Sequence, residues 1–205
     1  MSDPFVTKNI LKWYDLNKRS LPWRKNVSKE KRQYNTLISE FMLQQTQVAT
    51  VIPYFNKFVK EIPNIKKLAS VDNKKLIKLW EGLGYYSRAR NLKKAAQSVI
   101  KNFNGVIPDN FDDLKSLSGI GDYTANAILA IAFNKPYIPL DGNVERIIKR
   151  YLYLKKDKEI QKENLIEKKS ILGFSNRSSD YAQALMEFGA LVCKPTNPMC
   201  CQCPI

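Results

Sequence analysis

Apolar side chains recur every three to four residues along most of the chain, a spacing that places them on one face of a helix. Glycine and proline mark the joints between these segments, and no alternating strand pattern of comparable length occurs. The pattern therefore predicts an all-α protein. Its best-marked helices are expected in residues 5–16, 37–48, 51–59, 74–80, 91–103, 111–117 and 122–133. Later helices are expected in residues 144–153, 160–171 and 180–192.

The length of 205 residues suits one domain or two intertwined subdomains. No apolar run approaches the roughly 18 residues that cross a bilayer. The first residues, Met1 to Pro4, lack the basic and then apolar pattern of a secretory signal. We therefore expect an intracellular monomer without membrane contact, located in the cytoplasm or nucleoid if the source is bacterial.

The net charge of +15 favours a polyanionic partner, of which nucleic acid is the usual one. A lysine-rich surface that only maintains solubility would carry the same charge, so charge alone does not decide. The chain has no histidine, which excludes Ser-His-Asp and Cys-His catalysis within it. Acid–base chemistry must come from carboxylates, lysine, tyrosine or cysteine.

Two closely spaced glycines separate the helices predicted in residues 111–117 and 122–133, in the string Leu117-Ser118-Gly119-Ile120-Gly121. Backbone N–H groups of such a turn, with the positive end of the next helix, can bind a phosphate. A G-x-G pair alone also occurs in plain helix connections. The longer string LSGIGDYTA resembles the hairpin of helix-hairpin-helix base-excision DNA glycosylases, which usually have proline at the position of Ser118.

An aspartate, Asp141, stands just before the helix predicted from Val144. An aspartate in that place is most often an N-cap. The resemblance places it in the catalytic cleft, and the two roles are compatible because a cap holds the carboxylate rigid and ionised.

The string SEFMLQQTQV, residues 39–48, resembles the signature of the MutY-type adenine DNA glycosylases. It places Glu40 in a mostly apolar helix, where an unpaired carboxylate is costly and its pKa rises. A partly exposed glutamate at a helix edge is the alternative. The ten-residue match favours the functional interpretation of Glu40.

Further strings extend the resemblance to residues 11–205: LPWR at 21–24, LWEGLGYYSRARN at 79–91 and QALMEFGA at 183–190. The resemblance implies a two-subdomain helix-hairpin-helix glycosylase fold. A helical barrel with the hairpin is expected in residues 28–136, and an iron–sulfur-type subdomain in residues 1–27 and 137–205. The adenine pocket is expected to contain Trp23, Arg24, Leu43, Asn143 and Glu187.

Double-stranded DNA containing a mismatch is the implied partner, and the implied reaction removes adenine opposite 8-oxoguanine or guanine. Glu40 would act as the general acid towards the base, and Asp141 would stabilise the sugar cation. The residues expected at the DNA are Gln45, Thr46, Leu83, Tyr85, Gly119 and Gly121. Among them, Gln45, Leu83 and Tyr85 would enter the base stack, and a GLGYY loop is expected to expose its side chains.

The position of Tyr123, two residues after the second hairpin glycine, separates two kinds of enzyme. Strand-nicking relatives have a lysine there, which forms a Schiff base. Tyr123, counted among the catalytic positions, therefore predicts a monofunctional glycosylase with little lyase activity. The alternatives are an endonuclease-III-like lyase, a thymine–guanine mismatch glycosylase, and a catalytically impaired DNA-binding fragment. Tyr123 argues against the first of these, and Glu40 with MLQQTQ argues against both enzymes.

All four cysteines fall in the last thirteen residues, which indicates a metal site rather than a disulfide scaffold. The resemblance implies a 4Fe-4S cluster bound by a C-x6-C-x2-C-x5-C pattern. Cys193, Cys200 and Cys203 match its first three positions, whereas Cys201 does not match. We expect the fourth ligand beyond Ile205, so that the cluster is incomplete in these residues, and we expect the chain to be the catalytic half of a longer protein.

Overall fold

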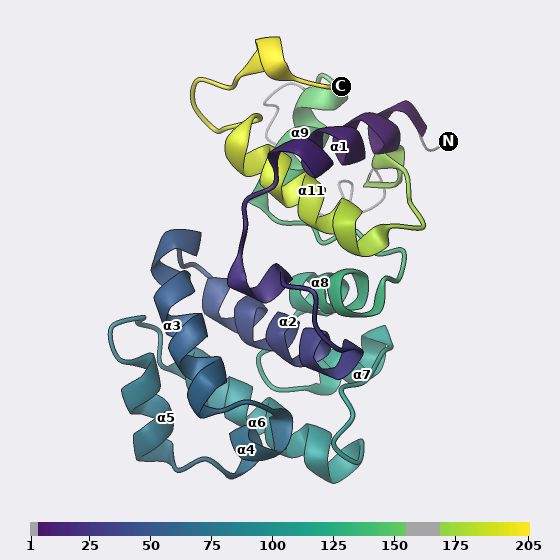
Figure 1. Cartoon of the computed structure of the whole chain (residues 1–205). Helices are drawn as coiled ribbons and strands as arrows, with labels where there is room; N and C mark the ends of the chain where they lie inside the picture. Colours follow the sequence, from purple (N-terminus) through teal and green to yellow (C-terminus); the bar gives the residue numbers. More distant parts are fainter. Residues whose placement is uncertain (1–3, 155–168) are drawn as a thin grey trace. The chain divides into compact units, whose positions relative to one another are not determined.

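The computed structural model describes residues 4–154 and 169–205, which form helices and loops without any strand (Figure 1). The all-α prediction is confirmed. The α-helices are α1 (Pro4–Asn17), α2 (Lys29–Leu43), α3 (Val48–Glu61), α4 (Ile65–Ser70), α5 (Asn73–Trp80), α6 (Ser87–Asn102), α7 (Phe111–Ser116), α8 (Asp122–Phe133), α9 (Gly142–Tyr151) and α11 (Ser178–Leu191). Short 3-10 turns are η1 (Pro22–Arg24), η2 (Lys169–Leu172) and η3 (Cys200–Gln202).

The prediction of one helix over residues 37–48 is wrong at both ends. Helix α2 begins at Lys29, where the Ser28 hydroxyl accepts from the Lys31 N–H at 3.3 Å, and it ends at Leu43. Its first turns are polar, so apolar spacing did not reveal them. Four loop residues follow before α3, and Gln45 among them has a φ of +55°, which no helix accommodates.

Two further differences concern short or undescribed segments. Helix α4 was not predicted, because six residues span less than two turns and show little periodicity. The side chain of Asn64 caps it by accepting from the Lys67 N–H at 2.9 Å. The helix predicted in residues 160–171 lies mostly outside the described residues, and its described end belongs to η2.

The chain divides into two compact units, residues 20–128 and residues 1–19 with 129–205. The sequence-based boundaries at 28 and 136 lie later in the chain than these. Contacts within each unit explain why both observed boundaries lie earlier than the predicted ones. The Trp23 ring of η1 meets Phe55 of α3 at 5.3 Å, and the Ser179 hydroxyl of α11 donates to the Ile131 carbonyl at 2.8 Å.

Within residues 20–128, α2 packs against α3, α6 and η1 (Figure 1). Every side chain of α2 from Gln33 to Met42 is buried. Leu37, Ile38 and Phe41 supply the apolar part of that surface. Because α2 is buried on nearly all sides, any polar side chain near its end is held inside the unit.

In the other unit, α11 packs against both α1 and α9. Their apolar faces form one core, to which Ile10, Ile148 and Phe188 contribute fully buried side chains. This packing brings the beginning of α9, where Asp141 stands, against the last turn of α11. None of the helices described is long and apolar enough to cross a membrane.

Candidate functional site

Glu40 lies in the last turn of α2, and only 5% of its side chain is exposed. The alternative of an exposed glutamate at a helix edge is thereby excluded. Other buried polar residues of α2, among them Asn35, Thr36 and Ser39, accompany it. A carboxyl group kept out of water reduces stability unless its surroundings compensate. A chemical use for Glu40 stays a prediction.

The hairpin between α7 and α8 packs tightly against two other helices. Gly119 has a φ of +81°, and a Cβ there would lie 2.8 Å from the Asn91 Cβ and 2.9 Å from the Phe41 ring. The Ser118 hydroxyl donates to the Asn91 side-chain oxygen at 3.2 Å. That bond joins the turn to α6.

The outer side of the same turn has room for a ligand. Gly119 and Gly121 are both exposed, and a Cβ at Gly121 would meet nothing within 4 Å. Packing among the described residues therefore does not require the second glycine. Tyr123, in the first turn of α8, is half-buried beside the hairpin, where it supplies a phenol and no amine.

Two loops expose one residue each in the left-handed backbone region. Between α2 and α3, Gln45 is exposed with a φ of +55°, and Thr46 beside it is half-buried. Between α5 and α6, Tyr85 has a φ of +46° and is 63% exposed. Non-glycine residues adopt this conformation rarely, and such strain is concentrated at functional sites.

The expectation that the GLGYY loop exposes its side chains is confirmed for Tyr85 and wrong for Leu83. Only 5% of Leu83 is exposed. The loop turns back after α5, with the Leu83 N–H donating to the Trp80 carbonyl at 3.0 Å, and glycines with positive φ stand on both sides. This turn directs the apolar side chain into the unit. A role for Leu83 at the DNA stays a prediction.

Trp23, Arg24 and Leu43 are all half-buried in the same unit as Glu40. Leu43 follows Glu40 by three residues on α2, so the two side chains share one face of the helix. Trp23 packs edge-on against Phe55. Their place in an adenine pocket stays a prediction.

Asp141 is the N-cap of α9, as predicted. Its Oδ1 accepts from the N–H groups of Asn143 and Val144 at 2.9 and 2.8 Å. Its Oδ2 accepts from the Asn143 side-chain amide at 2.8 Å. Asn143 is itself fixed by Arg146, whose Nη2 donates to its Oδ1 at 2.7 Å. Both oxygens of the half-buried carboxylate therefore accept hydrogen bonds, which fix its position.

Gly189 of α11 allows α9 to approach at this point. A Cβ at Gly189 would lie 2.5 Å from the Asn143 Cβ and 3.1 Å from the Asn143 Cα. Arg146 also donates to the Gly189 carbonyl at 2.7 Å and to the Cys193 carbonyl at 2.6 Å. Any side chain at residue 189 would therefore displace the group that orients Asp141.

Glu187 is the buried partner of Arg19, and only 1% of it is exposed. Its Oε1 accepts from the Arg19 Nε at 2.7 Å, and its Oε2 accepts from Nη2 at 3.0 Å. This pair joins the segment after α1 to α11. The predicted membership of Glu187 in the adenine pocket is a different role, which stays a prediction.

The cysteines predicted to bind metal line one cavity of about 370 Å³. Cys193, Cys200 and Cys203 border it, and Cys201 does not. Arg150 lines the same cavity and donates to the Cys193 sulfur at 3.3 Å. In the described part of the chain, no three Cys, Asp or Glu side chains converge on a single metal ion. Three thiols that border one cavity supply the ligand type that an iron–sulfur cluster uses.

Two residues that contact the end of α2 and the start of α9 were not predicted individually. Arg88 and Gly189 stand in the motifs at residues 79–91 and 183–190, yet nothing local distinguishes them there. Gly189 approaches Asn143, and Arg88 bonds to the Met42 carbonyl; in both cases the partner lies more than forty positions away. The one local indication for Arg88 was its place at the start of a helix whose following apolar residues are buried.

Comparison with known families agrees with this geometry. Residues 38–170, which contain Glu40, the hairpin and Asp141, match the model of the HhH-GPD superfamily base excision DNA repair proteins. The chain belongs to this superfamily. It shares 44% identity with an adenine DNA glycosylase of Buchnera aphidicola from Acyrthosiphon pisum, over 100% of the chain and 58% of that protein. It shares 42% with an adenine DNA glycosylase of Rattus norvegicus, over 97% of the chain and 40% of that protein.

Solved structures show the same fold. A thermostable thymine-DNA glycosylase superimposes with a TM-score of 0.82 at 26% identity, over 96% of this chain and 90% of that one. Endonuclease III trapped covalently on DNA superimposes with a TM-score of 0.77 at 24% identity, over 98% and 90%. This superfamily member spans about half the length of the adenine DNA glycosylases that it resembles.

Proposed function

We propose that this chain is the catalytic part of a monofunctional DNA glycosylase that removes adenine mispaired with 8-oxoguanine or guanine. The observation that carries the proposal is the burial of Glu40, 5% exposed at the end of α2. Relatives that share 42–44% identity over nearly the whole chain are named adenine DNA glycosylases. A buried acid suits adenine, a poor leaving group that departs more easily once its ring is protonated.

Glu40 and Asp141 would have different tasks in the reaction because their surroundings differ. The target nucleotide must leave the base stack before either can reach it. Glu40, which is buried at the end of α2, would donate a proton to a ring nitrogen of adenine. Asp141, satisfied as an anion by the start of α9, would stabilise the positive charge that develops on the sugar.

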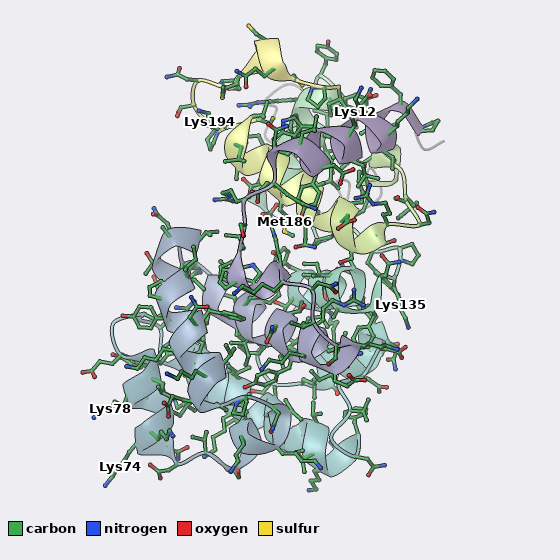
Figure 2. The ribbon with its side chains drawn as sticks, viewed as in Figure 1. Lys12, Lys74, Lys78, Lys135, Met186 and Lys194 are labelled. Atoms are coloured by element: carbon green, nitrogen blue, oxygen red, sulfur yellow. The ribbon has the colours of Figure 1, made fainter. Side chains whose placement is uncertain are left out.

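Double-stranded DNA is the partner that the surface of residues 20–128 favours. The exposed hairpin glycines and the positive end of α8 would bind backbone phosphate. Lysines add long-range attraction: Lys74 and Lys78 project outward from α5 (Figure 2). Gln45 and Tyr85 would enter the base stack from their two loops.

The cysteine cavity supports a resident 4Fe-4S cluster. Cys193, Cys200 and Cys203 would hold it, and Arg150 would donate a hydrogen bond to the Cys193 sulfur. When bound, the cluster would cross-link the segment after α11 and can undergo one-electron redox chemistry. The chain's own contribution is to bring three thiols and a guanidinium to one cavity.

A thymine–guanine mismatch glycosylase is the second candidate. The superposition with a thermostable thymine-DNA glycosylase favours it, and Tyr123 does not argue against it. Thymine can leave with less help from an acid than adenine does. Glu40 therefore favours adenine as the substrate.

A panel of duplexes under single-turnover conditions tests the proposal. The duplexes pair adenine with 8-oxoguanine, adenine with guanine, thymine with guanine, and an oxidised pyrimidine with guanine. We expect adenine release from the first two, with strand cleavage only after alkali. Release from the thymine duplex alone would favour the second candidate, and release from none would identify a DNA-binding fragment.

Replacing Tyr123 with lysine is expected to add strand nicking, because an amine would then stand beside the hairpin where a sugar carbon can be attacked. Borohydride trapping on abasic DNA measures the Schiff base. The control is Asp122→Lys, which adds the same amine at the exposed neighbouring position. A Tyr123→Lys protein that traps no more DNA than this control would contradict the proposed place of Tyr123.

A further inference from the structure

Arg88, in the first turn of α6, is a buried cation whose guanidinium bonds to backbone carbonyls. Only 6% of it is exposed. Its Nη1 donates to the carbonyls of Phe41 at 3.3 Å, Met42 at 2.8 Å and Gln44. Its Nη2 donates to those of Leu83 at 3.1 Å and Gly84 at 3.2 Å.

These carbonyls belong to two segments that are separate in sequence. One is the end of α2 with the loop that follows, where the last carbonyls of a helix lack partners within it. The other is the loop between α5 and α6. One side chain therefore closes the end of the helix that carries Glu40 and ties it to the second loop. A planar guanidinium presents donors in a rigid fork, which suits such a bridge.

Each of the two bridged loops exposes a non-glycine residue with positive φ. Gln45, with φ +55°, directly follows Gln44, and Tyr85, with φ +46°, directly follows Gly84. The carbonyl of one residue and the nitrogen of the next lie in one peptide plane. Holding the carbonyls of Gln44 and Gly84 therefore restricts the φ angles of Gln45 and Tyr85.

The aromatic contacts of Arg88 strengthen this arrangement. Its guanidinium carbon lies 5.5 Å from the centre of the Tyr85 ring and 5.7 Å from that of Trp80. Both distances are within the range of a cation–π interaction. Arg88 thus restrains the Tyr85 side chain as well as the peptide plane before it. The left-handed conformation, unfavourable for both exposed residues, is held by one group.

We propose that Arg88 is a positioning residue that holds Gln45 and Tyr85 together in the conformations with which they enter the base stack and expel the target nucleotide. This inference rests on the proposed function. Arg88 itself touches neither base nor sugar in this role. A lysine at the same place would keep the charge, but its single ammonium could not reach both loops at once.

The test compares Arg88→Lys with wild type and with Arg32→Lys, which makes the same exchange near the opposite end of α2. Three quantities are measured well below the melting temperature: affinity for undamaged duplex, single-turnover release of adenine, and fluorescence of 2-aminopurine in place of the target adenine. That fluorescence rises when the base leaves the stack.

We expect Arg88→Lys to lose the 2-aminopurine signal and to release adenine about 100-fold more slowly, as misplaced groups do. Its affinity for undamaged duplex, which phosphate contacts dominate, is expected to stay at the wild-type value. Arg32→Lys is expected to match wild type in all three. A merely structural role would lower all three together with the melting temperature, and that result, like a wild-type signal in Arg88→Lys, would overturn the inference.

A second variant leaves Arg88 in place and keeps the inference testable if Arg88→Lys does not fold. Gly84 has a φ of +72°, and a Cβ there would meet nothing within 4 Å, so Gly84→Ala strains the backbone before Tyr85 without a clash. We expect Gly84→Ala to lose the 2-aminopurine signal as well, while its affinity for undamaged duplex stays at the wild-type value. Gly105→Ala, at φ +81° in a distant loop, is the control. A wild-type flipping signal in folded Gly84→Ala would overturn the inference, and a wild type without any signal would overturn the proposed function together with it.

Discussion

Replacing Asp141 with asparagine is expected to slow base release by about 1,000-fold while DNA binding stays near the wild-type level. Asparagine is as good an N-cap as aspartate, and its Oδ1 can still accept from the Asn143 and Val144 N–H groups. The two backbone cap bonds of α9 are therefore preserved, and only the bond from the Asn143 side-chain amide to Oδ2 is lost. The negative charge that would stabilise the sugar cation is lost, so only the chemical step should suffer. Single-turnover base release and duplex affinity, measured on the same preparation, separate an effect on the chemical step from an effect on DNA binding.

Asp72→Asn is the matched control for this change. Asp72 caps α5 in the same manner, with its carboxylate accepting from the Lys74 and Lys75 N–H groups at 2.8 and 3.2 Å. It stands at the end of α5 remote from the GLGYY loop and has no proposed role in the reaction. Equal slowing in both variants would show that charge in general, rather than the charge of Asp141, supports activity. Wild-type release by Asp141→Asn would remove Asp141 from the mechanism.

Glu40→Gln is expected to lower adenine release by about 100- to 10,000-fold, the usual contribution of a general acid. Glutamine fills the same space in α2, so the melting temperature should change little. The exposed pair of Glu61 with Lys75 offers the control Glu61→Gln, which removes a carboxylate far less shielded from water. An unchanged rate in Glu40→Gln would contradict the assignment of Glu40 as the acid.

The dependence on pH distinguishes an acid from a residue that merely binds. A general acid must carry its proton, so release by the wild type should fall as the pH rises through the pKa of that group. Glu40→Gln has no such proton, so its residual rate should not show this fall as the pH rises. If the rate of Glu40→Gln still falls at high pH, the proton comes from another group.

Features set by neighbours in sequence could be predicted from the sequence itself. The helix periodicity, the hairpin glycines and the cap at Asp141 depend on residues within a few positions of each other. The Asp141 cap, for example, uses N–H groups two and three residues later. Glu40 stood out because a carboxylate interrupts an apolar helix. Local patterns therefore predicted the all-α fold class, and the resemblance of the surrounding strings to DNA glycosylases singled out the two candidate catalytic carboxylates.

Features that depend on distant residues were decided only by the tertiary structure. Leu83 is buried because its loop turns inward, although the sequence of that loop predicted exposure. Gly189 is required by the approach of Asn143, and Arg88 is required by carbonyls of α2 more than forty residues earlier. Such contacts leave no periodic trace, because they form where two segments meet in space. The sequence thus determined which residues carry the proposed chemistry, and packing decided which residues hold them in place.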